Sequence, residues 1–360
     1  MADRPLRIAM IAPPWFQVPP DAYGGIEQLV ADLVRTLADR GHEVTLIGAG
    51  NGDHLDATVL NTFDAPQAER IGESLPEALH AARAANLLDG LDVDVVHDHC
   101  LTGPLTAAAR NARTVVTVHG PVTGELGDLY AELGDAVELV AISDAQRSFR
   151  PDLNWVATVH NAIDVAGFPY RGDKQDYVLF LGRMSHDKGV HVAIEATRGA
   201  GQRLVIAAKC AEEPEQAYFD EYVRPRLGPD VDFVGEADLD RKRELLRDAR
   251  CLILPVLWEE PFGLVMVEAL ACGTPVVALR RGSVPEIVLP GENGLICDEP
   301  QDLPAALAEV GTIDPKACRR DAERRFDLPV MAQRYEHVYR ARRARRVRRV
   351  PFPADGPSAR

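Results

Sequence analysis

The chain has 360 residues, 46% hydrophobic and 26% charged, which is the composition of a globular protein long enough for two domains. Its formal net charge of −15 argues against general nucleic-acid binding. The six cysteines form no CxxC pair, there is no secretory signal, and no run approaches the roughly 18 apolar residues of a membrane span, so we expect a reduced, cytoplasmic protein.

The first half of the chain alternates short apolar runs with helical patterns. The spacing predicts strands at 7–12, 44–47, 93–97, 114–118, 139–142 and 155–159, and helices at 26–40, 76–88 and 104–111. Strand–helix–strand units in one sheet imply parallel strands with right-handed crossovers. The sequence therefore predicts one doubly wound α/β domain up to about residue 165.

A second α/β series follows a polar segment at 161–177, which we interpret as the interdomain linker. It predicts strands at 177–181, 203–207, 231–234, 251–254 and 276–278, and helices at 189–197, 239–249, 264–272, 303–310, 315–324 and 329–343. The predicted architecture is thus two α/β halves of similar size with a ligand cleft between them.

Two groups of polar residues stand out in the first half. Gly24 and Gly25 open the first helix, where free N–H groups favour an anion, although a tight turn that needs positive φ explains the same pair. His97, His99 and His119 follow two predicted strands, at the edge where open α/β sheets bind ligands. His97 and His99 share a face, so a metal site is conceivable, but no third ligand has convincing spacing.

The second half carries cations and carboxylates in loops that lead into helices. Arg183 and Lys188 lie in the loop after its first strand, where they could hold a diphosphate or be ordinary solvated charges. Glu260 precedes Gly263 at a helix entry, and Glu268 lies inside that apolar helix, where an unpaired charge is costly. A carboxylate there is suited to accept hydrogen bonds from vicinal hydroxyls. A paired-carboxylate glycosidase fits poorly, because that chemistry does not require a cationic diphosphate site.

Together these stretches resemble the retaining glycosyltransferases of family 4, which have the GT-B fold. The resemblance extends from residue 23 to residue 336. It rests on the glycine pair, VTVHG ending at Gly120, HNAID at 160–164, GRMSHDKG at 182–189 and, above all, EPFGLVMVEALACGTPV at 260–276, the E-x7-E signature of the family.

The resemblance implies two Rossmann-like, doubly wound domains that face a central cleft. Residues 1–165 would bind the acceptor, residues 166–328 the nucleotide sugar, and the helix at 329–343 would cross back onto the first domain. Residues 344–360 would be an Arg-rich, disordered tail. The implied activity is transfer of a hexosyl unit from a UDP- or GDP-sugar to a hydroxyl of a carbohydrate, lipid or small molecule, with retention, by an SNi-like route, without a metal or other cofactor.

The resemblance also implies roles for single residues. Arg183 and Lys188 would neutralise the leaving diphosphate, helped by the helix end at Gly24 and Gly25, and His119 would lie against the sugar near the reacting carbon. Glu260 would hold the hydroxyl groups of the donor sugar, together with the backbone of Phe262, Gly263, Leu264 and Val265. Glu268 would bind the hydroxyl groups of the donor ribose. Residues 207–210 depart from the glycine-rich turn of many relatives, so the base is not identified.

Two alternatives remain beside the transferase. A sugar-nucleotide epimerase or hydrolase on a similar frame would consume donor without an acceptor, and a sugar-binding protein would normally be secreted. The segment Arg340–Arg349 could be a peripheral contact with an anionic membrane or a solvated helix end, since residues 340–360 hold eight arginines and one aspartate.

Overall fold

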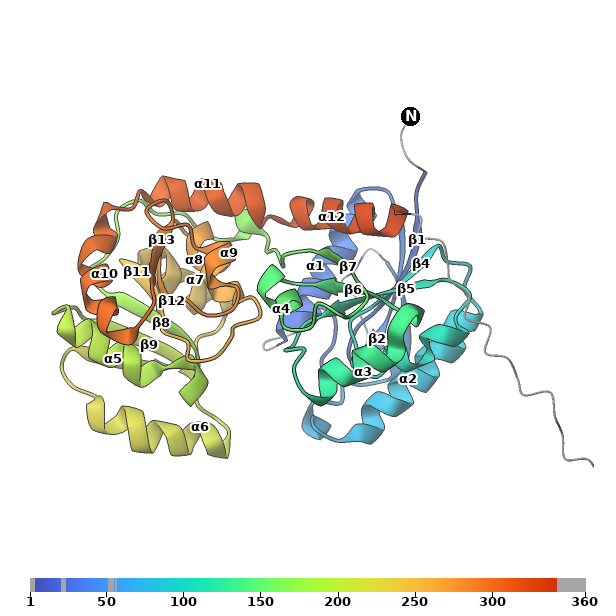
Figure 1. The fold of residues 1–360 in the computed structure, drawn as a ribbon, viewed down its shortest axis with the longest axis horizontal. Coiled ribbons are helices and arrows are strands. Elements are labelled where there is room, and N and C mark those ends of the chain that lie inside the picture. Colours follow the sequence, from blue (N-terminus) through green and yellow to red (C-terminus); the bar gives the residue numbers. More distant parts are fainter. Residues whose placement is uncertain (1–3, 21–23, 51–54, 56, 342–360) are drawn as a thin grey trace, which may run out of the picture.

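The computed structural model describes residues 4–20, 24–50, 55 and 57–341. These residues form two α/β units, each built on a parallel sheet (Figure 1). The tail at 344–360 and most of the Arg340–Arg349 segment lie outside the described residues. Within the described part of the chain, no helix is both long and apolar enough to cross a membrane.

The N-terminal sheet has the strand order β3-β2-β1-β4-β5-β6-β7, with every neighbouring pair parallel. Its strands are β1 (Arg7–Ile11), β2 (Glu43–Ala49), β3 (Thr58–Phe63), β4 (Val95–Asp98), β5 (Arg113–Val118), β6 (Glu138–Ala141) and β7 (Trp155–Thr158). The helices are α1 (Gly25–Asp39), α2 (Ser74–Asp89), α3 (Glu125–Leu133) and α4 (Asp144–Ser148). The central strands are apolar on both faces because helices cover both sides of a doubly wound sheet.

The C-terminal sheet has the order β10-β9-β8-β11-β12-β13 and is also parallel throughout. Its strands are β8 (Val178–Arg183), β9 (Leu204–Lys209), β10 (Val231–Gly235), β11 (Cys251–Leu254), β12 (Val276–Leu279) and β13 (Gly294–Cys297). The helices are α5 (Val190–Gly199), α6 (Glu213–Tyr218), α7 (Leu239–Asp248), α8 (Leu264–Ala271), α9 (Val284–Ile287), α10 (Leu303–Glu309) and α11 (Pro315–Arg325).

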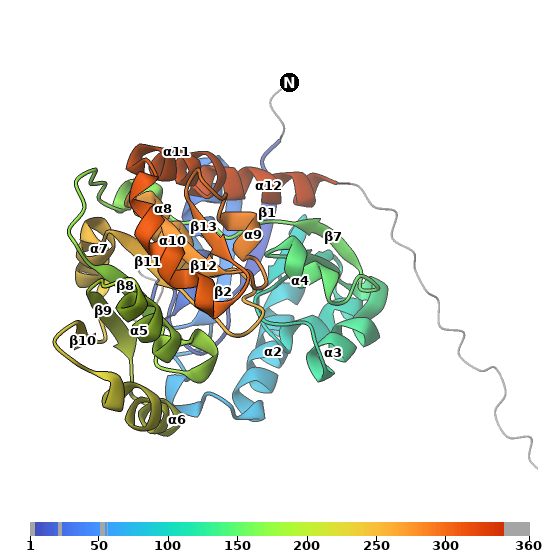
Figure 2. The ribbon, with the colours of Figure 1, turned by 60° about the vertical axis from the view of Figure 1, so that its left-hand side comes forward.

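The last helix, α12 (Leu328–Arg340), leaves the C-terminal unit and lies along the N-terminal one, as both views show (Figures 1 and 2). Its buried residues Met331, Tyr335 and Tyr339 belong to the same apolar core as α1 and β1. Before this helix the chain runs beside the linker, where Ile163 donates its N–H to the carbonyl of Phe326 at 3.0 Å. The two units are therefore connected by two adjacent chain segments.

Three local expectations differ from the structure. Strands β3 and β13 were not predicted, because both lie at sheet edges and carry polar or glycine residues that weaken the apolar pattern. The segment at 123–134, where no helix was predicted, contains helix α3, whose Tyr130 is buried. The helix expected at 104–111 is a 3₁₀ segment, Gly103–Ala109.

Candidate active site

The loops after β8 and β11 lie side by side, because these two strands are neighbours in the sheet. Leu257 donates its N–H to the carbonyl of Asp187 at 2.8 Å. Gly189 has a φ of 72°, and a Cβ there would lie 2.2 Å from the carbonyl oxygen of Pro255. A side chain at this glycine would therefore separate the loop of Arg183 and Lys188 from the loop of Glu260.

Lys188 and Glu260 form an ion pair across these loops. Lys188 Nζ lies 2.5 Å from Glu260 Oε2, and the side chains are 17% and 9% exposed. Trp258 donates its indole N–H to the same oxygen at 3.1 Å, and its ring centroid lies 4.9 Å from Nζ. Two sequence-predicted site residues thus meet directly, and the structure adds Trp258 as a third member.

The loop after β12 fixes the backbone of Glu260. Ser283 donates its N–H to the Glu260 carbonyl at 2.9 Å, and its hydroxyl donates to the carbonyl of Phe262 at 2.8 Å. A Cβ on Gly282 would lie 2.2 Å from the Glu260 carbonyl oxygen. The neighbouring carboxylate of Glu259 accepts the N–H of Gly282.

Helix α8 begins next to this loop and carries Glu268. Gly263 at its start is left-handed, with a φ of 77°, and the next residues, Leu264 and Val265, form its first turn. Glu268 Oε1 accepts a hydrogen bond from Lys242 of α7 at 2.6 Å. This lysine, which the sequence reasoning did not identify, explains how a carboxylate is tolerated inside an apolar helix.

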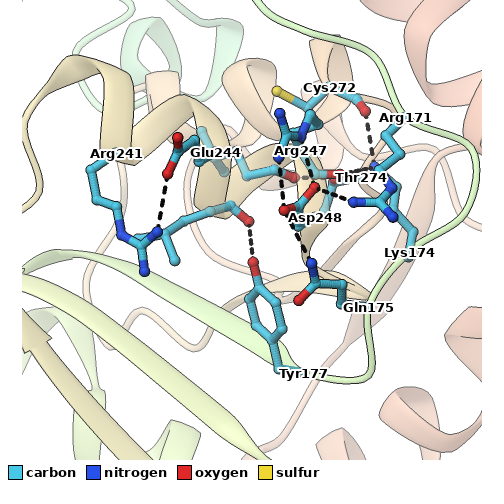
Figure 3. A network of polar contacts seen from close by, with 12 residues as sticks. Arg171, Lys174, Gln175, Tyr177, Arg241, Glu244, Arg247, Asp248, Cys272 and Thr274 are labelled. Carbon is cyan, nitrogen blue, oxygen red and sulfur yellow. Dashed lines mark hydrogen bonds and ion pairs between the residues drawn. The ribbon is translucent and has the colours of Figure 1, made fainter.

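The far ends of α7 and α8 are joined by Lys174 (Figure 3). Its Nζ donates to the carbonyls of Arg247 and Cys272 at 2.8 and 2.9 Å and to the hydroxyl of Thr274 at 2.8 Å. Burial lowers the pKa of Lys174 to about 8. Because the first two acceptors lie at the C-terminal ends of the two helices, this contact joins α7 to α8, the helices that carry Lys242 and Glu268.

Arg183 is the last residue of β8 and is half exposed. Its guanidinium lies 3.8 Å from the carboxylate of Asp187, and it is aligned with Lys209 on the neighbouring strand. It lies at the start of the loop that carries Lys188, and among the described residues no hydrogen bond or ion pair joins the two side chains. The structure therefore places two cations in one loop and leaves the Arg183 side chain accessible to an anion.

The glycine pair of the N-terminal unit lies at the start of α1, with Gly24 at the cap and Gly25 as the first helical residue. The carboxyl group of Glu27 folds back here and accepts hydrogen bonds from its own N–H and from that of Phe16. Burial raises the pKa of Glu27 to about 7, and these hydrogen bonds only partly offset it. The helix end predicted to hold an anion thus has a carboxyl group of its own.

The three histidines of the N-terminal unit form a cluster in which His97 and His99 are buried and His119 is partly buried. His99 Nδ1 lies 2.9 Å from His119 Nε2, and His99 Nε2 lies 3.1 Å from Met10 Sδ. His97 contacts the hydroxyls of Thr117 and Tyr339, both at 2.7 Å. This cluster ties His119 to helix α12 through buried polar groups.

Burial keeps the cluster neutral. It lowers the pKa of His97 to about 3 and that of His119 to about 4. The pKa of His99 falls well below its ordinary value, because burial and its two histidine neighbours all disfavour the charged ring. Over residues 4–20, 24–50, 55 and 57–341, no group of three or more His, Cys, Asp and Glu side chains is arranged to hold a metal ion.

Glu286 of α9 joins the two units. Its carboxylate accepts the N–H groups of Asp144 and Ala145, at the start of α4, at 2.8 and 2.7 Å, and lies 2.9 Å from His160 Nε2. Burial raises the pKa of Glu286, but the hydrogen bonds from His160 and the two amides outweigh it, so the pKa is lowered. Glu286 was not identified as a site residue from the sequence. It lies in α9, the short helix that follows β12.

This chain has the architecture of the GT-B fold: two parallel-sheet Rossmann-like units and a last helix that returns to the first unit. The family described as "Glycosyltransferase Family 4" matches residues 23–166, and "Glycosyl transferases group 1" matches residues 169–323. The chain belongs to family 4 of the GT-B glycosyltransferases. It is a hexosyltransferase that uses a nucleotide-sugar donor.

Several known proteins are similar over nearly the whole chain. A glycogen synthase of Mycobacterium tuberculosis is 28% identical over 411 residues, covering 97% of each chain. A phosphatidyl-myo-inositol mannosyltransferase of Mycobacterium leprae is 29% identical over 380 residues, covering 93% of this chain and 96% of that one. The crystal structure of AviGT4, a glycosyltransferase involved in avilamycin A biosynthesis, superposes with a TM-score of 0.71 at 27% identity, covering 93% of this chain and 97% of that one.

Proposed function

We propose that this chain is a retaining hexosyltransferase that moves a hexosyl unit from a UDP- or GDP-sugar to a hydroxyl acceptor, without a bound metal or other cofactor. The observation that supports this most directly is the ion pair between Lys188 and Glu260, with Nζ and Oε2 2.5 Å apart. It brings a cation suited to a diphosphate next to a carboxylate suited to sugar hydroxyls.

The charges that develop in the reaction explain the need for both cations. Breaking the bond between the anomeric carbon and the diphosphate oxygen leaves negative charge on the diphosphate and positive charge on the sugar. Arg183 and Lys188 stabilise the leaving diphosphate electrostatically, and fixed cations cost no reorganisation during the reaction. These two side chains supply the positive charge that a divalent ion supplies to diphosphates elsewhere.

Glu260 and Glu268 then bind neutral hydroxyl groups. Each carboxylate has one oxygen on a lysine, Lys188 or Lys242, and the second oxygen has no hydrogen-bond partner among the described residues. We assign Glu260, with the backbone of Phe262–Val265, to the sugar, and Glu268 to the ribose. A carboxylate oxygen accepts hydrogen bonds from hydroxyl groups without proton transfer. In this proposal neither residue is a general acid or base.

The N-terminal unit completes the site. His119 is held neutral by burial, which suits a hydrogen-bonding contact with the sugar rather than a charge. Gly24 and Gly25 at the start of α1 would approach the diphosphate. The relatives are named for glycogen synthesis and for mannosylation of phosphatidyl-myo-inositol, so we propose a carbohydrate or lipid hydroxyl as the acceptor, with small molecules as a further class.

The proposed step retains the configuration of the anomeric carbon. The acceptor oxygen attacks the anomeric carbon from the face that the diphosphate leaves, and the acceptor proton passes to a β-phosphate oxygen. One carbon–oxygen bond forms, one breaks, and no covalent intermediate with the protein is required. Holding donor and acceptor together supplies the orientation that such a step requires.

The test is a thermal-shift screen of UDP-, GDP- and ADP-sugars with and without EDTA, followed by NMR of the product. We expect one donor to stabilise the chain equally well with EDTA, and a product with the donor's anomeric configuration. Inversion, or dependence on a divalent ion, would contradict the mechanism. Consumption of the donor at the full rate without any acceptor would indicate an epimerase or hydrolase instead.

Lys188→Ala tests the diphosphate role. We expect turnover to fall roughly 10²–10³-fold, the range for one electrostatic group in a transition state. The matched control is Lys316→Ala, an exposed lysine of α11 outside the site, which should leave turnover unchanged. Steady-state kinetics with the donor from the screen measures both, and near-normal turnover in Lys188→Ala would remove Lys188 from the mechanism.

A further inference from the structure

Trp258 contacts both members of the ion pair in the proposed donor site. Its indole N–H and Lys188 Nζ both donate to Glu260 Oε2, at 3.1 and 2.5 Å, and its ring face lies over the ammonium group. Glu260 Oε1 has no hydrogen-bond partner among the described residues. One carboxylate oxygen therefore carries both protein contacts, and the other is left for a hydroxyl.

The two proposed roles of this pair compete with each other. Glu260 neutralises Lys188 as long as the pair is closed, yet a diphosphate needs the positive charge of Lys188. When a nucleoside diphosphate binds, its phosphate oxygens compete with Glu260 for the ammonium group. Glu260 is only 7% exposed, so losing this partner would leave a poorly solvated carboxylate.

We propose that Trp258 is the positioning residue that solves this problem: it keeps Glu260 Oε2 hydrogen-bonded while Lys188 exchanges Glu260 for the donor diphosphate. This inference rests on the proposed function. The indole N–H is a donor with no acceptor capacity and already lies on Glu260 Oε2, so it can keep this oxygen hydrogen-bonded when Lys188 leaves. The ring face attracts the ammonium group in either position, because cation–π attraction extends to about 6 Å.

The backbone arrangement supports this exchange. Ser283 and Gly282 hold the main chain of Glu260 from the loop after β12, and Lys188 belongs to a different loop. Movement of the lysine therefore need not draw the carboxylate with it. Oε1 then remains aimed by the contacts on Oε2, ready to accept a sugar hydroxyl.

The test separates the two contacts of the indole ring. Trp258→Phe keeps an aromatic face for Lys188 but removes the N–H from Glu260. We expect its affinity for UDP or GDP, measured by calorimetry, to stay within about threefold of wild type. Turnover of the nucleotide sugar should fall roughly 10- to 100-fold, the loss expected for one hydrogen bond to a charged group.

Trp155→Phe is the matched control. It also removes an indole N–H, which donates to the carbonyl of Arg150 at 2.7 Å in the N-terminal unit, away from this ion pair. Tryptophan emission provides a second readout, since movement of Lys188 changes the charge over the Trp258 ring. We expect nucleoside diphosphate to change the emission of wild type and of Trp155→Phe, and the change to disappear in Trp258→Phe.

The outcomes separate this inference from the proposed function. Nucleotide binding by calorimetry with no Trp258-dependent change in emission would overturn the inference alone. An equal loss of nucleotide affinity and of turnover in Trp258→Phe would also overturn it, because the N–H would then serve the diphosphate and not the sugar. A wild-type chain that binds no nucleoside diphosphate would contradict the proposed function and this inference together.

Discussion

At the scale of single residues, Glu27 places a carboxyl group at the helix end that begins with Gly24 and Gly25. Glu27 is 4% exposed and lies in the first turn of α1. A carboxylate at a helix N-terminus is favoured by the dipole, but here burial dominates and raises the pKa of Glu27 to about 7. Near neutral pH this group therefore changes charge in the region proposed to face the diphosphate.

The raised pKa predicts a specific pH dependence of stability. Because the folded-state pKa of Glu27 lies above the ordinary value of 4.5, the protonated carboxyl group stabilises the folded chain. This stabilisation is fully present below about pH 4.5 and is lost as pH rises through 7. The loss amounts to about 3 kcal/mol at roughly 1.4 kcal/mol per pH unit. Glu27→Gln should remove this loss, as measured by urea unfolding between pH 4.5 and 8.

Glu125→Gln is the control for this measurement. Glu125 also lies in the first turn of a helix, α3, but is exposed, so its substitution should leave the pH profile as in wild type. An unchanged profile in Glu27→Gln would show that the carboxyl of Glu27 is solvated and ionises normally.

At the scale of elements, the loops after β8, β11 and β12 act as one unit because their backbones contact each other closely. Gly282 illustrates this: its φ is 51°, and any Cβ would lie 2.2 Å from the Glu260 carbonyl oxygen. The loop after β12 therefore sets the position of the carboxylate loop after β11.

Gly282→Ala should consequently reduce activity more than stability. The new methyl group must push Glu260 away, so we expect turnover of the nucleotide sugar to fall at least about tenfold, as for other misplacements of positioning residues. Gly291→Ala is the matched control, since its φ is 82° but nothing lies within 4 Å of the added Cβ. It should lose only the roughly 1–2 kcal/mol of left-handed strain and keep normal turnover.

The elements also show what could be predicted from the sequence. The strand at 251–254 and the helix starting at 264 were placed correctly, because buried parallel strands and apolar helices leave continuous runs between glycine and proline signals. The motifs placed Lys188 in the loop after the first strand of the second half and Glu260 at the entry of the helix at 264–272, and the structure shows that these loops are adjacent. Their partners Trp258 and Lys242 could not be predicted, because side-chain pairing depends on tertiary distances that no spacing rule encodes.

At the scale of the whole molecule, the two units meet next to the loops proposed to bind the donor. The linker and the segment before α12 run side by side, and the rings of His160, Phe262 and Phe326 lie within 5.8–6.1 Å of one another there. Phe262 belongs to the proposed sugar loop. A hinge movement about these two segments would therefore reach the donor site directly, and such movements are common in two-domain enzymes.

Glu286 makes a contact that opposes this movement, because its carboxylate on the C-terminal unit accepts two amide N–H groups at the start of α4 on the N-terminal unit. Glu286→Ala should leave both units folded but free to separate. We expect faster hydrogen exchange at the amides of Asp144 and Ala145 and a larger radius of gyration by X-ray scattering. Glu292→Ala, an exposed carboxylate on the same unit, is the control and should change neither.

The same contact should respond to acid. Since the pKa of Glu286 is lowered in the folded chain, its stabilising effect is present above the ordinary carboxyl pKa and is lost as pH falls through the lowered value. Wild-type scattering should therefore approach that of Glu286→Ala only in this acidic range. The prediction is wrong if the amides of Asp144 and Ala145 exchange as slowly in Glu286→Ala as in wild type. The connection through helix α12 would then hold the units together, and domain opening would depend on the segments at 160–168 and 325–328.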